Sequence, residues 1–500
     1  ALAMAAASST TSPSLDKPLL DAAETEPEPP AEELVAAEDA ESGMSRDSSF
    51  LQAYSLSVSA SDRQGGIKSS IYALVSTMMG GGVLSLPYGM HQAGLLAGPV
   101  LLVALGLVNR FSLWLVITNG VSVRASSYED MVGKLLGRRM AVFLTIILVL
   151  LTWFVIVAYS ILIGDLVGPV LRCAFPTLVD GAALRSTAFI SLRSATIAGA
   201  HVLIFPITRQ ASLKSLRASS AISLATTLTL AAIITAKAIQ SMVSGEAGPV
   251  EHDDLMPMGI QGGLMSSSVF SISFLCHFNV LPITEDLQRP TAQRFRKVVD
   301  RTVLVACALY LCVGIFGCLE FDNAPGGVKG NVLNNYPAND GAVSVGRLAL
   351  TLTVSIGITL MVHPCRASGR HLAQCLKPRT LGASPMSSQA GPAEVSRQLS
   401  ASSQPAGACW GPCRTTIEAL LIQSTAIVTA IFIPEITFVW SVMGSTVCML
   451  VAFILPAACY LSLHKWQVLR TRRCFGALAL LILGILLSIV CSVQSVMQLF

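Results

Sequence analysis

The sequence contains few charged residues: only 12% of its 500 residues are Asp, Glu, Lys or Arg, whereas 53% are hydrophobic. A soluble domain typically carries about 25% charged residues. A chain so poor in charge cannot cover a water-facing surface, so lipid must cover much of it. The sequence also lacks His-Glu-x-x-His and Gly-x-Ser-x-Gly motifs, and its thirteen cysteines are scattered without histidine-backed zinc spacing. We therefore predict neither an enzyme nor a metal site.

Residues 1–64 lack the apolar content that folding requires. They are rich in Ala, Ser, Pro and Glu, and they hold twelve acidic residues against three basic ones. Such a segment cannot bury enough surface to offset its conformational entropy. We predict a disordered acidic cytoplasmic tail, either simply solvated or regulatory, followed by a transmembrane domain over residues 65–500.

The rest of the chain alternates long apolar runs with short polar links. A helix needs about 20 apolar residues to span the hydrocarbon core. Eleven runs meet this length, which predicts an all-α polytopic membrane protein with about eleven transmembrane helices. They lie near residues 68–92, 95–118, 139–165, 188–207, 218–240, 264–284, 302–320, 343–364, 416–434, 437–463 and 475–497.

The charges in the links predict the orientation of the chain. If the N-terminus is cytoplasmic, Lys and Arg gather in the cytoplasmic links, whereas the opposite links near residues 246–254 and 320–322 are acidic. This is the positive-inside pattern. It places the C-terminus outside or in a lumen, and it makes residues 366–415, rich in Ser, Gln, Pro and Gly, a flexible cytoplasmic loop.

The first run contains Met79 followed by the glycine triplet Gly80, Gly81 and Gly82. Close helix packing through small residues is one explanation. The alternative is an unwound segment between two half-helices, which is tolerated at this depth only where it lines a cavity or is buried in protein. The second half-helix would then direct free N–H groups and a positive dipole end at an anionic group such as a carboxylate.

The sixth run contains His277, Asn279 and, three residues later, Pro282. Proline lacks an N–H, so the carbonyl of Phe278 loses its helical partner. Polar side chains at mid-membrane are expensive and usually functional, although a histidine satisfied by a neighbouring helix is a simpler explanation. This run comes five helices after the first, which is the pattern of inverted five-helix repeats that each open with an interrupted helix.

The residues at these two interruptions resemble those of the amino acid/auxin permease family. The stretch Gly80-Gly-Gly-Val-Leu-Ser-Leu-Pro-Tyr88 is similar to its opening-helix motif, and Phe274-Leu-Cys-His277 with Leu287-Gln-Arg-Pro-Thr291 is similar to its sixth helix and following loop. The resemblance covers about residues 65–497 and points to the branch of sodium-coupled neutral amino acid transporters. It implies a LeuT-like 5+5 inverted repeat plus one helix.

We expect the substrate carboxylate to bind the amides around Gly80–Gly82, beside Met79. The α-amino group is expected at the carbonyls of Phe274 and Phe278, near His277 and Asn279, with the Ser355 hydroxyl close by. Because these runs contain no acid, neutral amino acids are expected rather than cationic ones.

The coupling ion is left open between Na⁺ and H⁺, with no other cofactor expected. Sodium-coupled members tend to carry an asparagine where this sequence has Ser76 and Thr77, which favours proton coupling or uncoupled exchange. The candidate ion-coupling residues are Ser76, Thr77, His277, Thr351, Ser355 and Thr359.

These observations predict a secondary active transporter of small neutral amino acids with a midplane site formed by helices one and six. An amino-acid-binding nutrient sensor of the same fold is the alternative, and binding without flux would distinguish it. The expected partners are the amino acid and the lipid bilayer, with no nucleic acid, and the oligomeric state is open. The expected location is the plasma membrane or a vacuolar or lysosome-like membrane.

Overall fold

The computed structural model describes residues 65–176, 191–209, 219–245, 259–288, 290–322, 324–376, 411–433, 435–467 and 471–497. All of these belong to one unit of the chain, Ala53–Phe500. The predicted tail (residues 1–64), the acidic link 246–254 and residues 377–410 of the predicted loop lie outside the described residues.

The described residues are helical, with a single isolated bridge between Gly65 and Leu287. The elements are α3 (Ile67–Met78), η2 (Gly81–Ser85), α4 (Leu86–Ala93), α5 (Ala97–Ser122), α6 (Tyr128–Leu136), α7 (Arg138–Ala174), α10 (Leu192–Thr208), α11 (Ser219–Ser244), α12 (Gly259–Ser273), α13 (His277–Glu285), α14 (Ala292–Phe321), η5 (Val332–Asn334), α15 (Gly341–Leu376), α17 (Gly411–Phe432), α18 (Ile436–Met443), η6 (Gly444–Cys448), η7 (Leu450–Ile454), α19 (Leu455–Leu463) and α20 (Arg472–Met497).

The polytopic helical class predicted from the apolar runs is confirmed. Nine helical segments in the described part of the chain are long and apolar enough to cross a membrane, and the bent pair Ile67–Met78 and Gly81–Ala93 makes a tenth span. The shorter apolar helix α10 corresponds to the remaining predicted run. Large apolar side chains are widely exposed, as at Leu203 and Phe432, each 80% accessible. Such surface is stable only against lipid.

The helices extend further into the predicted cytoplasmic loop than the sequence suggested. α15 continues to Leu376 and α17 begins at Gly411, so both ends of the predicted loop 366–415 are helical. Arg370 forms an ion pair with Glu418, which holds these two helix ends together. The loop was predicted from the Ser, Gln, Pro and Gly content of residues 366–415, and this content gives no sign of an ion pair between its two ends.

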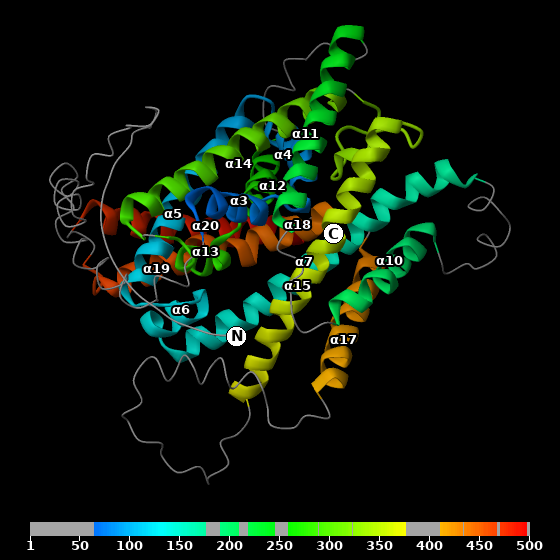
Figure 1. The fold of residues 1–500 in the computed structure, drawn as a ribbon. Coiled ribbons are helices and arrows are strands. Elements are labelled where there is room, and N and C mark those ends of the chain that lie inside the picture. The colour runs from blue at the N-terminus through cyan, green and yellow to red at the C-terminus, as the bar shows by residue number, and fades with distance from the viewer. Residues whose placement is uncertain are drawn as a thin grey trace, which may run out of the picture. The chain divides into compact units, whose positions relative to one another are not determined.

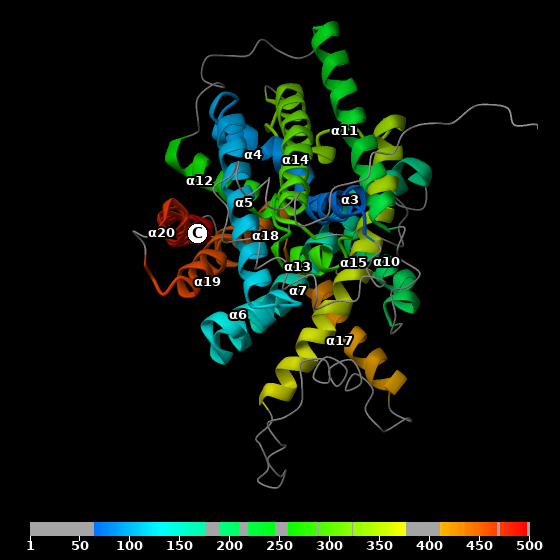
Figure 2. The same ribbon diagram turned by 60° about the vertical axis from the view of Figure 1, so that its left-hand side comes forward.

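The helix α14 lies at the centre of one group of helices, packed against α3, α4, α5 and α11 (Figures 1 and 2). α7 packs along most of α15 and also contacts α10 and α17. Between these groups, α7 and α14 each contact the short helix η2. The interrupted first span is therefore enclosed by helices distant in sequence.

The segment before α15 is fixed by polar contacts. The buried guanidinium of Arg347 donates to the carbonyl oxygens of Leu333 and Tyr336, at 2.8 and 2.9 Å. Lys237 lies 2.5 Å from the carboxylate of Asp340. Burial acts to raise the pKa of Asp340, but the hydrogen bond and charge of Lys237, together with backbone hydrogen bonds from Val343 and Ala342, leave the pKa below its usual value.

Candidate functional site

The first membrane span is interrupted between Met78 and Gly81. α3 ends at Met78, η2 begins at Gly81, and the two halves of the span are bent by 53°. Gly80 has an extended backbone, with φ −101° and ψ −156°. Its N–H donates to the carbonyl of Met78 at 2.9 Å, and the N–H of Met79 donates to Val75 at 2.9 Å. The backbone at the glycine triplet is therefore not continuous helix.

Steric contacts explain why glycine occupies this interruption. A methyl group added at Gly80 would lie 2.5 Å from the hydroxyl of Tyr159, and one added at Gly81 would lie 2.4 Å from Leu162 Cδ1. At Gly82 the nearest atom would be the Ser273 hydroxyl, at 3.0 Å. Real Cβ atoms essentially never approach other atoms more closely than 3.0 Å. The triplet thus allows α7 and α12 to approach the backbone directly.

The Tyr159 hydroxyl contacts the unwound backbone. It accepts a hydrogen bond from the N–H of Gly81, the first residue of the second half-helix. This N–H is one of the groups that a helix leaves without an internal partner. Tyr159 therefore occupies the position where a carboxylate oxygen was expected to bind.

The second interruption lies in the sixth span. α12 ends at Ser273 and α13 begins at His277, so residues 274–276 join two half-helices. Phe274 and Cys276 are both buried. The carbonyl of Phe274 accepts a hydrogen bond from the side-chain amide of Asn109 at 3.2 Å. One of the two carbonyls expected to meet the substrate amino group thus already has a protein partner.

One side chain connects the two interruptions. The hydroxyl of Tyr310, on α14, lies 2.9 Å from the carbonyl oxygen of Met78 and 2.7 Å from that of Ser273. These carbonyls belong to the last residues of α3 and α12, where the next turn of helix would have supplied N–H partners. Tyr310 therefore joins the two broken ends, and it is fully buried.

The remaining predicted substrate residues fall into separate environments. His277 is fully buried, and its Nε2 lies 3.2 Å from the hydroxyl of Ser112 on α5. Asn279 donates to the Thr77 hydroxyl at 3.4 Å, which brings together one predicted substrate residue and one predicted ion residue. Phe278 is partly exposed within the first turn of α13. Ser355 is half-buried within α15.

The hydroxyls nominated for sodium bond mainly within their own helices. Those of Thr351 and Thr359 donate to carbonyls of their own helix one turn earlier, at 2.7 and 3.3 Å. Thr77 does the same towards Ala73 at 2.9 Å, and Ser76 lies on the same helix, α3. Within the described side chains, no hydrogen bond links α15 to α3. The lone pairs of these oxygens nevertheless remain able to bind a cation.

Sequence reasoning missed three aromatic residues at this site: Tyr159, Tyr310 and Trp440. Trp440, on α18, is buried, and a methyl group on Gly81 would lie 3.3 Å from its Cζ2 atom. Its indole N–H has no hydrogen-bond partner among the described residues. A buried, unpaired donor beside an interrupted helix can bind an anionic oxygen. These three residues lie in apolar runs of the sequence, where aromatic residues are common. The backbone groups that they contact belong to helices distant in sequence, so the sequence alone did not indicate the contacts.

Comparison with known proteins identifies the family of this chain. The profile of the family described as transmembrane amino acid transporter protein matches residues 63–500. The chain belongs to this family. Family membership supports a transporter rather than an enzyme, and a multi-pass location in the membrane. The family named from the motifs is thereby confirmed.

Two named amino acid transporters are similar in sequence to this chain. A protein from Mus musculus named "Putative sodium-coupled neutral amino acid transporter 11" is 24% identical over 398 residues, covering 79% of this chain and 78% of its own. "Vacuolar amino acid transporter 5" from Saccharomyces cerevisiae is 25% identical over 316 residues, covering 61% of this chain and 67% of its own. At this identity, both relatives share the family with this chain.

Among solved structures, MhsT in complex with L-phenylalanine aligns over 84% of this chain and 98% of its own, with 13% identity and a TM-score of 0.45.

Proposed function

We propose that this member of the family is a secondary active transporter of small neutral amino acids. The observation that carries the proposal is the connection of two interrupted spans through Tyr310, whose hydroxyl lies within 3 Å of the carbonyls that end α3 and α12. Interrupted helices with unpaired backbone groups are the usual substrate sites of inverted-repeat transporters. A transporter needs such a site because it must bind a zwitterion without burying a charged side chain.

The proposed carboxylate position lies at the start of η2. There the backbone N–H groups of Gly81 and Gly82 and the indole N–H of Trp440 can surround an anion, with the Tyr159 hydroxyl as a further ligand. Tyr159 contacts Gly81 in this structure, so the substrate would share or displace that contact. The amino group would lie towards the second interruption, near the carbonyls of Phe274 and Phe278.

The preference for neutral amino acids follows from the charges around this site. Asp165, on α7, is already paired with Arg193 at 3.3 Å. Glu435 accepts a hydrogen bond from Thr437 at the start of α18. A lysine or arginine substrate would therefore bring an additional cation without a free carboxylate to meet it, which costs several kcal/mol or more.

We further propose alternating access without strict dependence on Na⁺, by proton coupling or exchange. The N-terminus is assigned to the cytoplasm and the C-terminus to the outside or a lumen. The membrane is either the plasma membrane or a vacuolar or lysosome-like one, the latter by analogy with the yeast relative.

The experiment that tests the proposal is uptake of labelled alanine or glutamine into proteoliposomes. Gly81→Leu should abolish uptake while the protein still reaches the membrane, because its side chain would enter the space held by Leu162 and Trp440. Normal uptake by this variant would contradict the proposed site.

A further inference from the structure

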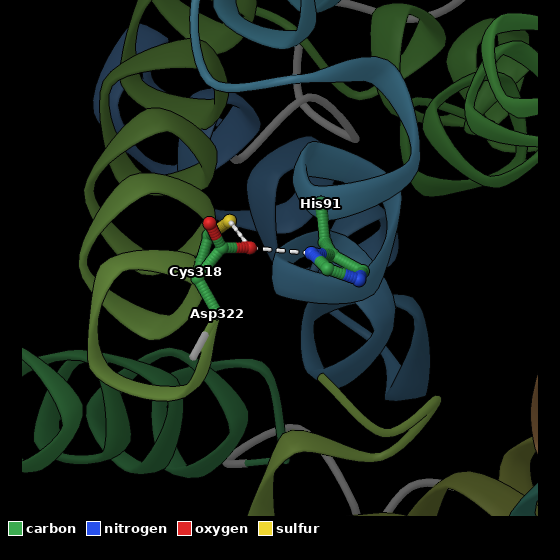
Figure 3. Close-up of side chains that lie close together, drawn as sticks. All are labelled: His91, Cys318 and Asp322. Atoms are coloured by element: carbon green, nitrogen blue, oxygen red, sulfur yellow. Dashed lines mark hydrogen bonds and ion pairs between the residues drawn. The ribbon is translucent and has the colours of Figure 1, made fainter. Parts of the chain in front are cut away.

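His91, Cys318 and Asp322 form a cluster away from the two interruptions. The imidazole Nδ1 of His91 pairs with the carboxylate of Asp322. The Cys318 sulfur lies 3.7 Å from the same carboxylate oxygen. Figure 3 shows the ring of His91 on α4 facing the Asp322 and Cys318 side chains at the end of α14. One ligand atom from each residue lies within 4.8 Å of the others.

Helix geometry and close packing bring these three groups together. Cys318 and Asp322 are four residues apart at the end of α14, so they share one face of the helix. His91 lies in the last turn of α4. A methyl group at Gly314 would lie 2.9 Å from Met90, and one at Gly317 would lie 2.6 Å from Pro87. The two glycines thus allow α4 to lie directly against α14, which fixes the cluster.

We propose that His91, Cys318 and Asp322 bind a divalent transition cation of the Zn²⁺ type. An imidazole nitrogen, a thiolate and a carboxylate oxygen are the three ligand types that zinc takes in proteins, and a water would complete a tetrahedral site. Hard cations such as Mg²⁺ and Ca²⁺ prefer oxygen ligands alone. The sequence predicted no metal site because the spacing of these residues along the chain carried no signal.

The geometry and the charges suit this cation. Tetrahedral zinc with bonds of about 2.0–2.3 Å holds its ligand atoms roughly 3.3–3.8 Å apart, so small side-chain rotations suffice. The Cys318 thiol would release its proton to solvent, and the imidazole would keep one proton on Nε2. The thiolate and the carboxylate then balance the charge of the cation. The side chains of His91 and Asp322 are 16% and 10% exposed, so two of the three ligands are partly accessible at the protein surface.

Binding would connect two elements that bear on transport. α4 is the second half of the interrupted first span, and α14 carries Tyr310. A cation held by both would fix the end of α4 against α14. The cation site shares no residue with the proposed substrate site. The proposal that it binds a cation does not rest on the proposed transport function.

The test is Co²⁺ titration of the purified full-length protein in detergent. Co²⁺ replaces Zn²⁺ in such sites, and thiolate ligation produces an intense near-ultraviolet charge-transfer band. We expect the band in the wild type, its removal by added Zn²⁺, and its loss in Cys318→Ser. His91→Gln and Asp322→Asn should weaken it at least tenfold in apparent affinity. Zn²⁺ should also raise the unfolding temperature of the wild type by about 2 °C or more.

Two matched controls distinguish this site from adventitious thiols. Cys173 and Cys413 are exposed, so Cys173→Ser and Cys413→Ser should leave the band unchanged. A wild-type protein without the band, or a band that survives Cys318→Ser but not the control substitutions, would overturn the proposal. The absence of the band in the wild type overturns the proposal whether or not the variants fold.

Discussion

The hydroxyl of Tyr310 lies 2.9 Å from the carbonyl oxygen of Met78, the last residue of α3. It also lies 2.7 Å from the carbonyl oxygen of Ser273, so one hydroxyl contacts the broken ends of both spans. A hydroxyl has a single proton, and it can donate to only one of these oxygens at a time. This makes Tyr310 the residue on which the relative position of the two interruptions depends.

Tyr310→Phe should reduce uptake at least tenfold and lower stability by about 1–3 kcal/mol, because the buried hydrogen bond that the Tyr310 hydroxyl donates at the two broken helix ends is lost. Uptake and thermal unfolding of the purified protein measure both effects. Tyr72→Phe, on the exposed face of α3, is the matched control and should behave like the wild type. If Tyr310→Phe transported at the wild-type rate, the connection between the interruptions would have no functional importance.

Gly81→Leu should abolish uptake, since even its Cβ would lie 2.4 Å from Leu162. The matched control is Gly199→Leu on α10, where an added Cβ meets no atom within 4 Å. Surface expression of both variants, measured by labelling, separates loss of transport from loss of protein. Equal uptake by the two variants would contradict the proposed substrate site at the glycine triplet.

A substrate with a cationic side chain should compete poorly. Unlabelled alanine or glutamine should suppress uptake of labelled alanine, whereas arginine at the same concentration should be at least tenfold less effective, because Asp165 is already paired with Arg193. Competition assays on one proteoliposome preparation measure this ratio. Displacement by arginine as strong as that by glutamine would mean that a free carboxylate faces the site.

Replacing Na⁺ with choline at fixed pH should leave most uptake intact, since this chain has Ser76 and Thr77 where sodium-coupled members tend to carry an asparagine. Loss of most transport on this replacement would reject the proposal in favour of a sodium site.

The role of His277 can be tested separately. The Ser112 hydroxyl donates a hydrogen bond to the Ala452 carbonyl. Its oxygen can therefore accept a hydrogen bond from Nε2–H of His277. The Nδ1 atom then lacks a partner among the described residues, which favours the neutral imidazole. His277→Gln should therefore lower stability without changing the pH profile of uptake. A flattened profile would instead identify the histidine as the proton carrier.

The sequence was informative wherever a physical constraint acts locally. Apolar runs of membrane length predicted the spans, and the glycine triplet at residues 80–82 indicated the interruption that lies between Met78 and Gly81. The extension of α15 to Leu376 was not predicted, because the pairing of Arg370 with Glu418 joins residues 48 positions apart. The helix α6 was also missed, since nine residues are too few for a membrane span.

The site was only partly predictable. The backbone of Gly80–Gly82 was nominated from composition alone, but the partners of that backbone come from packing. Tyr159, Tyr310 and Trp440 lie in apolar runs, where an aromatic residue is expected whichever way it faces. His91 and Asp322 lie 231 positions apart, and only the contact between α4 and α14 brings them together.

The most direct test of the account is the time course of labelled alanine in sealed proteoliposomes that contain the wild-type protein, with detergent-solubilised protein assayed for binding in parallel. The account predicts accumulation inside the vesicles that unlabelled neutral amino acids suppress and that Gly81→Leu abolishes. Saturable binding to the solubilised protein with no entry into the vesicles would contradict transport and would indicate an amino acid sensor built on the same fold.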